Sequence, residues 1–164
     1  MSNRFKPRKS WREKLENPPA GLPKVVEGPA TWEKRFGGRR VLVPTPLLVD
    51  GVVRKVRKGK LITVGQIRRQ LAKEFGAEAT CPLTTGIFLR IIAEVAEEDR
   101  SATTSCRSEK QITPYWRVVK DDGSLNPKFP GGVRGQAARL GQEGHKVAGK
   151  EKIPKVENFE KALV

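Results

Sequence analysis

The sequence predicts a mainly α-helical domain with a small β-hairpin, arranged like a winged helix and preceded by an irregular basic arm. Three segments between residues 46 and 100 carry apolar residues at helical spacing. A strand-like segment with a tight Asp-Asp-Gly turn follows at residues 112–127. Helices followed by a hairpin give the element order of a winged helix, a fold that places its third helix in a DNA groove.

The charge of the chain predicts a polyanionic partner. The 164 residues carry a formal net charge of +15. Residues 1–60 hold 16 Lys and Arg against 5 Asp and Glu, whereas residues 61–164 hold 17 against 13. An excess of one sign favours nucleic acid, with a membrane surface as the alternative. No run of 18 apolar residues is present, so we expect no segment that spans a membrane.

The cysteine and histidine content predicts no metal, no cofactor and no disulfide framework. Cys81 and Cys106 lie 25 residues apart, and the chain has one His. The basic N-terminus is followed by no apolar stretch, so it is not a secretory signal. We therefore expect a reducing, cytoplasmic environment and, with a nucleic-acid partner, a nucleoid-associated location.

The N-terminal arm, residues 1–45, is rich in Pro, Gly and charged residues. Two of its segments, SWREKLEN and TWEKRF, could form short helices capped by Ser10 and Thr31. Three of its aromatic side chains need a place to bury: Trp11, Trp32 and Phe36. We therefore expect the arm to lie on the domain or on a ligand, with disorder as the alternative.

The first two helices of the domain follow from spacing and capping signals. The first has an apolar face at Val49, Val52, Val53 and Val56, and Gly59 is expected to end it. The second begins at a capping box, in which Thr63 is followed three residues later by Gln66. Its apolar stripe is Val64, Ile67, Leu71 and Phe75, and Gly76 is expected to stop it.

The third helix, residues 83–100, is the predicted recognition helix. Thr84 or Thr85 is its expected cap. Its inward-facing residues are predicted to be Ile87, Phe88, Ile91, Ile92 and Val95. Because the start of such a helix contacts DNA, the predicted contact residues are Leu83, Thr84, Thr85, Gly86 and Arg90. The acidic end of the helix is expected to point away from DNA.

A cluster of basic residues on the first two helices is the predicted phosphate-binding set. Its members are Arg54, Lys55, Arg57, Lys58, Lys60, Arg68 and Arg69. The alternative is a solvated face without a ligand. The overall excess of positive charge favours phosphate contacts, since a solvated face needs no single-sign excess.

The remaining segments complete the predicted domain organisation. A helix from Val133 to Gln142 follows the hairpin and is stopped by Gly144. The tail, residues 148–164, is expected to be extended and then to end in a short helix from Val156. The predicted units are thus the arm, the domain at 46–147 and this tail.

Four segments in register resemble a known family. They are RKGKLITVGQIRRQLA, the apolar helix that follows, TPYWRVVKDDGSLN and PGGVRGQAARLGQEG. Over residues 46–147 they resemble the DNA-binding domain of the O6-alkylguanine-DNA alkyltransferases, and still more their alkyltransferase-like relatives.

The resemblance implies that alkyl transfer is absent. The family's active enzymes have Pro-Cys-His-Arg in the hairpin region, and a Glu on the later helix orients the His that activates the Cys. Here the Cys and His positions are Tyr115 and Trp116, and counting between the shared glycines puts the Glu position at Ala137. A phenol without an adjacent base is a poor nucleophile at neutral pH.

The alkyltransferase-like proteins lack the acceptor Cys and bind alkylated guanine without transferring the alkyl group. The resemblance therefore implies a non-enzymatic protein of DNA repair, with double-stranded DNA and other repair proteins as partners, and a monomer. The implied base pocket is formed by Tyr115, Arg117, Phe129, Pro130 and Gly131. By alternation along a strand, Tyr115 would face this pocket and Trp116 the core.

Two alternatives remain open at the level of the sequence. The family's Tyr at the start of the second helix is Val64 here, and no Arg stands at the start of the recognition helix. A general winged-helix protein that binds DNA or RNA without lesion specificity is one alternative. The other is an alkyltransferase that uses Cys81, because a helix N-terminus lowers the pKa of a thiol.

Overall fold

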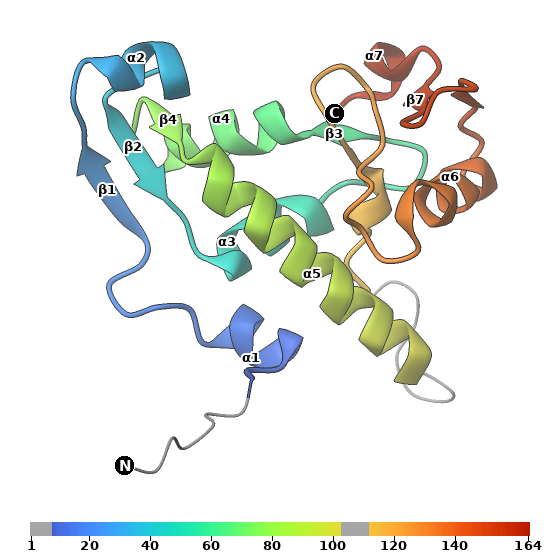
Figure 1. Ribbon diagram of the computed structural model, residues 1–164, viewed down its shortest axis with the longest axis horizontal. Coiled ribbons are helices and arrows are strands. Elements are labelled where there is room, and N and C mark those ends of the chain that lie inside the picture. The colour runs from blue at the N-terminus through green and yellow to red at the C-terminus, as the bar shows by residue number, and fades with distance from the viewer. Residues whose placement is uncertain (1–7, 103–111) are drawn as a thin grey trace.

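The computed structural model describes residues 8–102 and 112–164, so Cys106 lies outside the described residues. The helices are α1 (Trp11–Glu16), α2 (Thr31–Phe36), α3 (Pro46–Arg54), α4 (Val64–Glu74), α5 (Pro82–Ala102), α6 (Gly132–Gln142) and α7 (Phe159–Ala162). The strands are β1 (Lys24–Glu27), β2 (Arg40–Val43), β3 (Ile62–Thr63), β4 (Ala79–Thr80), β5 (Val118–Val119), β6 (Val147–Ala148) and β7 (Lys155–Val156). The mainly helical fold class with small β-elements is confirmed (Figure 1).

Helices α3 and α4 begin where side chains satisfy their first backbone N–H groups. The Thr45 hydroxyl accepts from Leu48 N at 3.3 Å, and Pro46 follows it at the first helical position. The predicted capping box of α4 is confirmed, because Thr63 and Gln66 exchange hydrogen bonds of 3.1 and 2.9 Å. Helix α3 ends at Arg54 rather than at the predicted Gly59.

Helix α5 is the long central helix, and most of its predicted inward face is confirmed. Phe88, Ile91, Ile92 and Val95 are buried. Ile87 is 50% exposed, so its predicted burial is wrong. It lies one turn after the exposed Leu83, on the face of the helix that points away from the core.

The start of α5 does not use the predicted threonine cap. The helix begins at Pro82, before Thr84 and Thr85. The Thr85 hydroxyl instead donates back to the Cys81 carbonyl at 2.8 Å, which is a bond that threonine commonly makes inside a helix.

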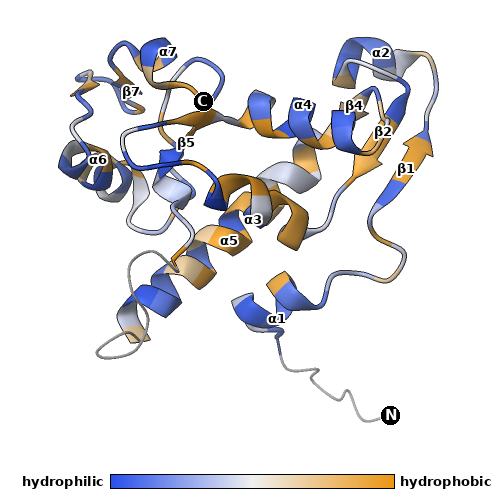
Figure 2. Ribbon diagram, turned by 180° about the vertical axis from the view of Figure 1, so that it is seen from behind, coloured by the Kyte–Doolittle hydropathy of each residue, from blue (hydrophilic) through white to orange (hydrophobic). Residues whose placement is uncertain are grey.

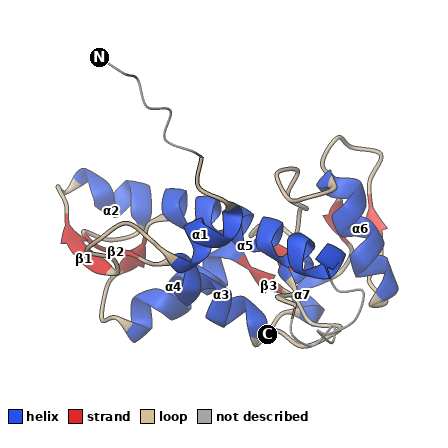
Figure 3. Cartoon of the chain, turned by 90° about the horizontal axis from the view of Figure 1, so that it is seen from below, coloured by secondary structure: helices blue, strands red, loops and turns tan. Residues whose placement is uncertain are grey.

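The N-terminal arm contributes a sheet that sequence patterning missed. Strands β1 and β2 pair antiparallel, and β2 pairs in parallel with β4. Val41 and Leu42 of β2 are buried. Figure 3 shows β1 and β2 beside α2 at one end of the molecule, with α6 at the other end. The expectation that the arm lies on the domain is confirmed for its described part.

The two short helices of the arm are both present, but only one has the predicted cap. Ser10 caps α1 in a capping box with Glu13. Thr31 is the first residue of α2 and not its cap, because Ala30 holds the cap position and makes no side-chain hydrogen bond.

The segment at residues 112–127 differs from the predicted strand. Tyr115–Arg117 forms a 3-10 turn, and only Val118 and Val119 are extended. Strand β5 pairs in parallel with β3 rather than with its own return. The tight turn is confirmed, since Gly123 N donates to Lys120 O and Lys120 N to Ser124 O, both at 2.9 Å.

Two apolar clusters form the interior. The larger lies among α3, α4 and α5, whose ribbons carry much of the orange in Figure 2. The smaller consists of Leu61, Val119, Leu125, Leu140 and Val156. Trp116 packs against both clusters and so connects them.

The end of the chain packs on the domain. Leu61 N donates to Ala162 O at 2.9 Å, and Val164 N donates to Leu61 O at 3.0 Å. Helix α7 begins at Phe159 and not at the predicted Val156, which lies in β7. Helix α6 agrees with the prediction to within one residue. Among residues 8–102 and 112–164, no helix has the length and apolar character needed to cross a membrane.

The first testable prediction concerns the predicted boundary at residue 45. Leu42 is fully buried, so Leu42→Ala is expected to lower the free energy of unfolding by about 2–5 kcal/mol. The matched control is Leu47→Ala, which truncates a side chain that is 50% exposed and should change stability by less than about 0.5 kcal/mol. Urea unfolding followed by circular dichroism measures both. Equal stabilities for the two variants would show that β2 does not belong to the folded core.

Candidate nucleic-acid interface

A groove of about 820 Å³ runs along the first half of α5. Its walls come from α1, the start of α4, the start of α5 and the two segments 120–121 and 126–128. The apolar part of its lining includes Trp11, Val64, Pro82, Leu83, Ile87 and Pro127. The basic part is Arg8, Lys14, Arg90, Lys120 and Lys128.

The groove is electropositive, because its five cations face one acidic side chain, Asp121. That carboxylate is already engaged, since Asp121 Oδ1 accepts from Gly65 N at 2.7 Å at the start of α4. A Cβ on Gly65 would stand 2.5 Å from the same oxygen, so glycine is required for this approach. With its acid directed at a helix N-terminus, the groove suits the phosphates of a nucleic acid.

Two apolar side chains stand out from the basic surroundings. Leu83 is 70% exposed and Ile87 is 50% exposed, and the two lie one turn apart on α5. Large apolar side chains exposed on a charged surface commonly mark a site of contact with a partner.

The structure places the five predicted recognition-helix residues in two different environments. Leu83, Gly86 and Arg90 line the groove. Thr85 is buried, and Thr84 is half-buried with its hydroxyl 3.4 Å from the Cys81 carbonyl. The apolar Leu83 and the basic Arg90 therefore line the groove from the first half of α5, whereas the two threonine hydroxyls do not.

The predicted phosphate-binding set does not line this groove. Arg54 pairs with Asp50 at 2.6 Å. Arg68 donates to the carbonyls of Thr80 and Phe36 at 2.8 and 3.4 Å. The other five members of the set are exposed: Lys55, Arg57, Lys58, Lys60 and Arg69.

Sequence reasoning missed four of the five groove cations. Arg8, Lys14, Lys120 and Lys128 come from segments more than 100 residues apart, and only the folded chain brings them together with Arg90. The excess positive charge of the chain was the one signal that pointed to such a site.

The predicted base pocket is filled around Tyr115. This side chain is 2% exposed, and its hydroxyl donates to Glu97 Oε1 at 2.6 Å. Its ring packs edge to face against Phe129, with 5.2 Å between centroids. Burial, followed by the hydrogen bond to Glu97, raises the pKa of the phenol. Phe129 is also buried, whereas Pro130 is half-buried and Gly131 is exposed.

The predicted placement of Tyr115 in a pocket is wrong, whereas Trp116 packs against both apolar clusters, as its predicted core position requires. Tyr115 lies in the core, and the half-buried Trp116 lines a smaller pocket of about 160 Å³ together with Arg117 and Arg139. The physical reason is the 3-10 turn. With three residues per turn, successive side chains differ in direction by about 120° instead of alternating between two faces.

The side chain at position 116 donates a hydrogen bond to the carboxylate of Glu143. Counting between the shared glycines puts the family's Glu at position 137, which is an alanine here, so this expected position is corrected to 143. Trp116 Nε1 donates to Glu143 Oε1 at 2.9 Å, and Arg117 donates to both carboxylate oxygens at 2.7–3.1 Å. Gly59 N adds a fourth donor at 3.3 Å. Glu143 lies at the C-terminal cap of α6.

The side chains at positions 115 and 116 both donate to carboxylates, Tyr115 Oη to Glu97 and Trp116 Nε1 to Glu143. Burial raises the pKa of Glu143, but hydrogen bonds from Arg117, Trp116 and Gly59 outweigh it and hold the pKa below its usual value. An indole N–H only donates, so Trp116 cannot accept a proton from a neighbour. Arg117 also donates to the Val56 carbonyl at 2.6 Å, which fixes it as a structural link.

Cys81 is half-exposed and directly precedes Pro82, which lines the groove. Its carbonyl accepts hydrogen bonds from the backbone and hydroxyl of Thr85, at 3.2 and 2.8 Å. Within the part of the chain that the structure describes, no three His, Cys, Asp or Glu side chains gather into a group that could hold a metal ion.

Two solved structures are similar to this chain. One is the crystal structure of S. pombe Atl1 in complex with damaged DNA containing O6-carboxymethylguanine, with 18% identity over 73% of this chain and 93% of that chain and a TM-score of 0.47. The other is S. pombe ATL in complex with DNA, with 17% identity, the same coverage and a TM-score of 0.45. No protein-family model matches the chain, and no curated protein sequence matches it.

The second testable prediction concerns Glu143. Because its folded pKa is lowered, its contribution to stability is complete above about pH 4.5 and is lost as the pH falls through the folded pKa. Glu143→Gln should therefore cost about 1.5–3 kcal/mol at pH 7 and progressively less below pH 4.5.

Urea unfolding at a series of pH values measures this difference. Glu160→Gln, at an exposed position, is the control and should stay within about 0.5 kcal/mol of the wild type throughout. A cost for Glu143→Gln that is independent of pH would contradict the charged pairing.

Proposed function

We propose that this protein binds duplex DNA and recognises alkylated bases without transferring the alkyl group, as the alkyltransferase-like proteins that its sequence resembles do. The observation that carries the proposal is the basic groove along the first half of α5. In the proposal, double-stranded DNA is the partner and the protein acts as a monomer. Other repair proteins take over the marked site, and the location is cytoplasmic and nucleoid-associated.

The groove supports DNA binding through charge and shape. Five cations from four parts of the chain point to one site, and its single acid is engaged by Gly65 N. Lys and Arg side chains gathered in this way neutralise phosphates and release counterions. Arg90 and Leu83 lie on the helix that a winged helix would present to a DNA groove.

The corner around Tyr115 supports binding without alkyl transfer. Tyr115 is buried and has a raised pKa, so its phenolate is scarce at neutral pH. The side chain at position 116 is an indole that donates to Glu143, and an indole cannot serve as the general base.

The apolar part of the groove supports recognition of an alkylated base. Alkylation at O6 of guanine weakens its pairing, so the damaged base leaves the stack at lower cost than a normal base. Val64, Pro82 and Pro127 offer apolar surface that an added alkyl group can contact.

A second candidate is a nucleic-acid-binding protein without lesion specificity. The observation that favours it is the filled base pocket, since Tyr115 and Phe129 pack against each other where a base was expected. An alkyltransferase that uses Cys81 is a third outcome, which a mass measurement separates from the other two.

The third testable prediction is preference for a lesion without covalent change. The protein should bind a duplex that contains one O6-methylguanine more tightly than the same duplex with guanine, with fluorescence anisotropy measured at about 0.15 M salt. The intact mass of the protein should be unchanged afterwards. Equal affinity would leave the second candidate, and a mass increase that Cys81→Ser abolishes would establish the third.

The fourth testable prediction is the salt dependence of the groove cations. Lys120→Gln and Lys128→Gln should each reduce the slope of log K against log salt concentration by about 1, because each lysine is expected to contact one phosphate. The matched control is Lys24→Gln, an exposed lysine on β1 outside the groove. Unchanged slopes for both groove variants would move the DNA contact elsewhere, and the exposed members of the predicted phosphate set would be tested next.

A further inference from the structure

We infer that α1, from the N-terminal arm, is the second wall of the DNA-binding groove and that Trp11 stacks on an unpaired base of the bound strand. This inference rests on the proposed function, because it assigns a part of the same groove. It concerns a segment outside residues 46–147, over which the sequence resembles the alkyltransferase family. The arm would thus contribute to the binding site itself and not only to folding.

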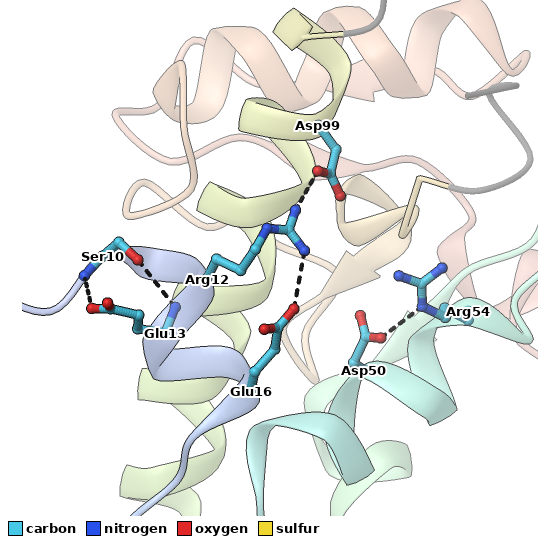
Figure 4. Close-up of polar contacts among 7 residues, drawn as sticks. All are labelled: Ser10, Arg12, Glu13, Glu16, Asp50, Arg54 and Asp99. Atoms are coloured by element: carbon cyan, nitrogen blue, oxygen red, sulfur yellow. Dashed lines mark hydrogen bonds and ion pairs between the residues drawn. The ribbon is translucent and has the colours of Figure 1, made fainter. Parts of the chain in front are cut away.

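Helix α1 is fixed on the domain and is therefore able to present a side chain in a set direction. Leu15 is buried in the larger cluster, and the Ser10–Glu13 capping box closes the start of the helix. Arg12 pairs with Glu16 at 3.3 Å and also with Asp99 on α5. Figure 4 shows α1 alongside α5, with Arg12 reaching across to Asp99.

Trp11 is half-buried against the larger cluster, and two cations of the groove lie near its ring. Lys14 Nζ is 4.4 Å from the centre of its ring, and the Arg90 guanidinium carbon is 5.5 Å from it. The Arg90 guanidinium reaches its one recorded acidic partner, Glu94, only at 3.9 Å, and no ion pair is recorded for Lys14 within the described residues. An aromatic ring with two cations near it matches a nucleotide, which combines a flat base with a negative phosphate.

The dimensions of the groove agree with this occupant. Its volume of about 820 Å³ lies in the range of clefts that hold ligands of nucleotide size and larger. Trp11 and Lys14 line the groove from α1, and Pro127 and Lys128 line it from a separate segment. Each of the two segments thus contributes one apolar and one basic side chain.

The chain provides a matched control in Trp32, the other tryptophan of the arm. Trp32 packs edge to face on Phe36, with 5.1 Å between ring centroids, and covers Gly28 so closely that a Cβ there would clash with the ring. It does not line the groove. The two tryptophans therefore differ in access to a bound strand while sharing the same chemistry.

The test compares Trp11→Leu, Trp11→Phe and Trp32→Leu with the wild type. Each is titrated with a single-stranded oligonucleotide of about 12 nucleotides and with the O6-methylguanine duplex, while anisotropy and tryptophan emission are recorded. Trp11→Leu is expected to bind both about tenfold more weakly and to lose the quenching of emission that saturating DNA causes in the wild type. Trp11→Phe, which keeps an aromatic ring, should recover most of the affinity, and Trp32→Leu should keep both affinity and quenching.

The outcomes separate this inference from the function on which it rests. If the wild type binds DNA and Lys120→Gln weakens that binding, but Trp11→Leu retains full affinity and quenching, α1 is a packing element and the inference is overturned alone. Equal losses for Trp11→Phe and Trp11→Leu would also overturn it, because stacking requires only an aromatic ring. If the wild type binds neither the single-stranded oligonucleotide nor the O6-methylguanine duplex, the proposed function fails and the inference fails with it.

Discussion

The arrangement of the C-terminal half depends on the hydrogen bonds that the carboxylate of Glu143 accepts. These come from the loop after α3, through Gly59, and from both side chains at the end of the 3-10 turn, Trp116 and Arg117. Because Arg117 also holds the Val56 carbonyl, one acid fixes the end of α6 against the segment that leads into α4. Breaking a half-buried pair of this kind leaves an uncompensated charge, which is costly. Trp116, held in this way, contacts both apolar clusters and fixes how they meet.

The parts of the fold that the sequence predicts are those with a repeated or local signal. Helices α3 to α5 follow from apolar spacing, and the start of α4 follows from the Thr63–Gln66 capping box. The pair β1–β2 was missed because its strands are four residues long and lie among Pro and Gly residues. The 3-10 turn at Tyr115 was missed because three residues have no period to detect, and that error placed the buried Tyr115 in a pocket.

The candidate site was predictable only in part, for a related reason. The start of α5 was identified as a contact surface, and Leu83, Gly86 and Arg90 line the groove. The remaining cations lie in separate segments, and each is an ordinary surface residue in its own surroundings. Sequence proximity favoured Arg54 and Arg68 instead, but the fold uses their side chains to hold Asp50 and two backbone carbonyls. Basic residues that are neighbours in the sequence therefore identify a region of high positive charge, but they do not show which of the side chains face a common site.

The contact between Gly65 and Asp121 has a consequence for how this sequence can vary. The Asp121 carboxylate occupies the space that any side chain at position 65 would need, and it also serves the first turn of α4. A relative with a larger residue at position 65 must carry a different residue or a displaced turn at position 121. The two positions lie 56 residues apart, yet they are constrained to change together. An aligned set of divergent relatives should show this as covariation, with the small residue and the acid kept or lost as a pair.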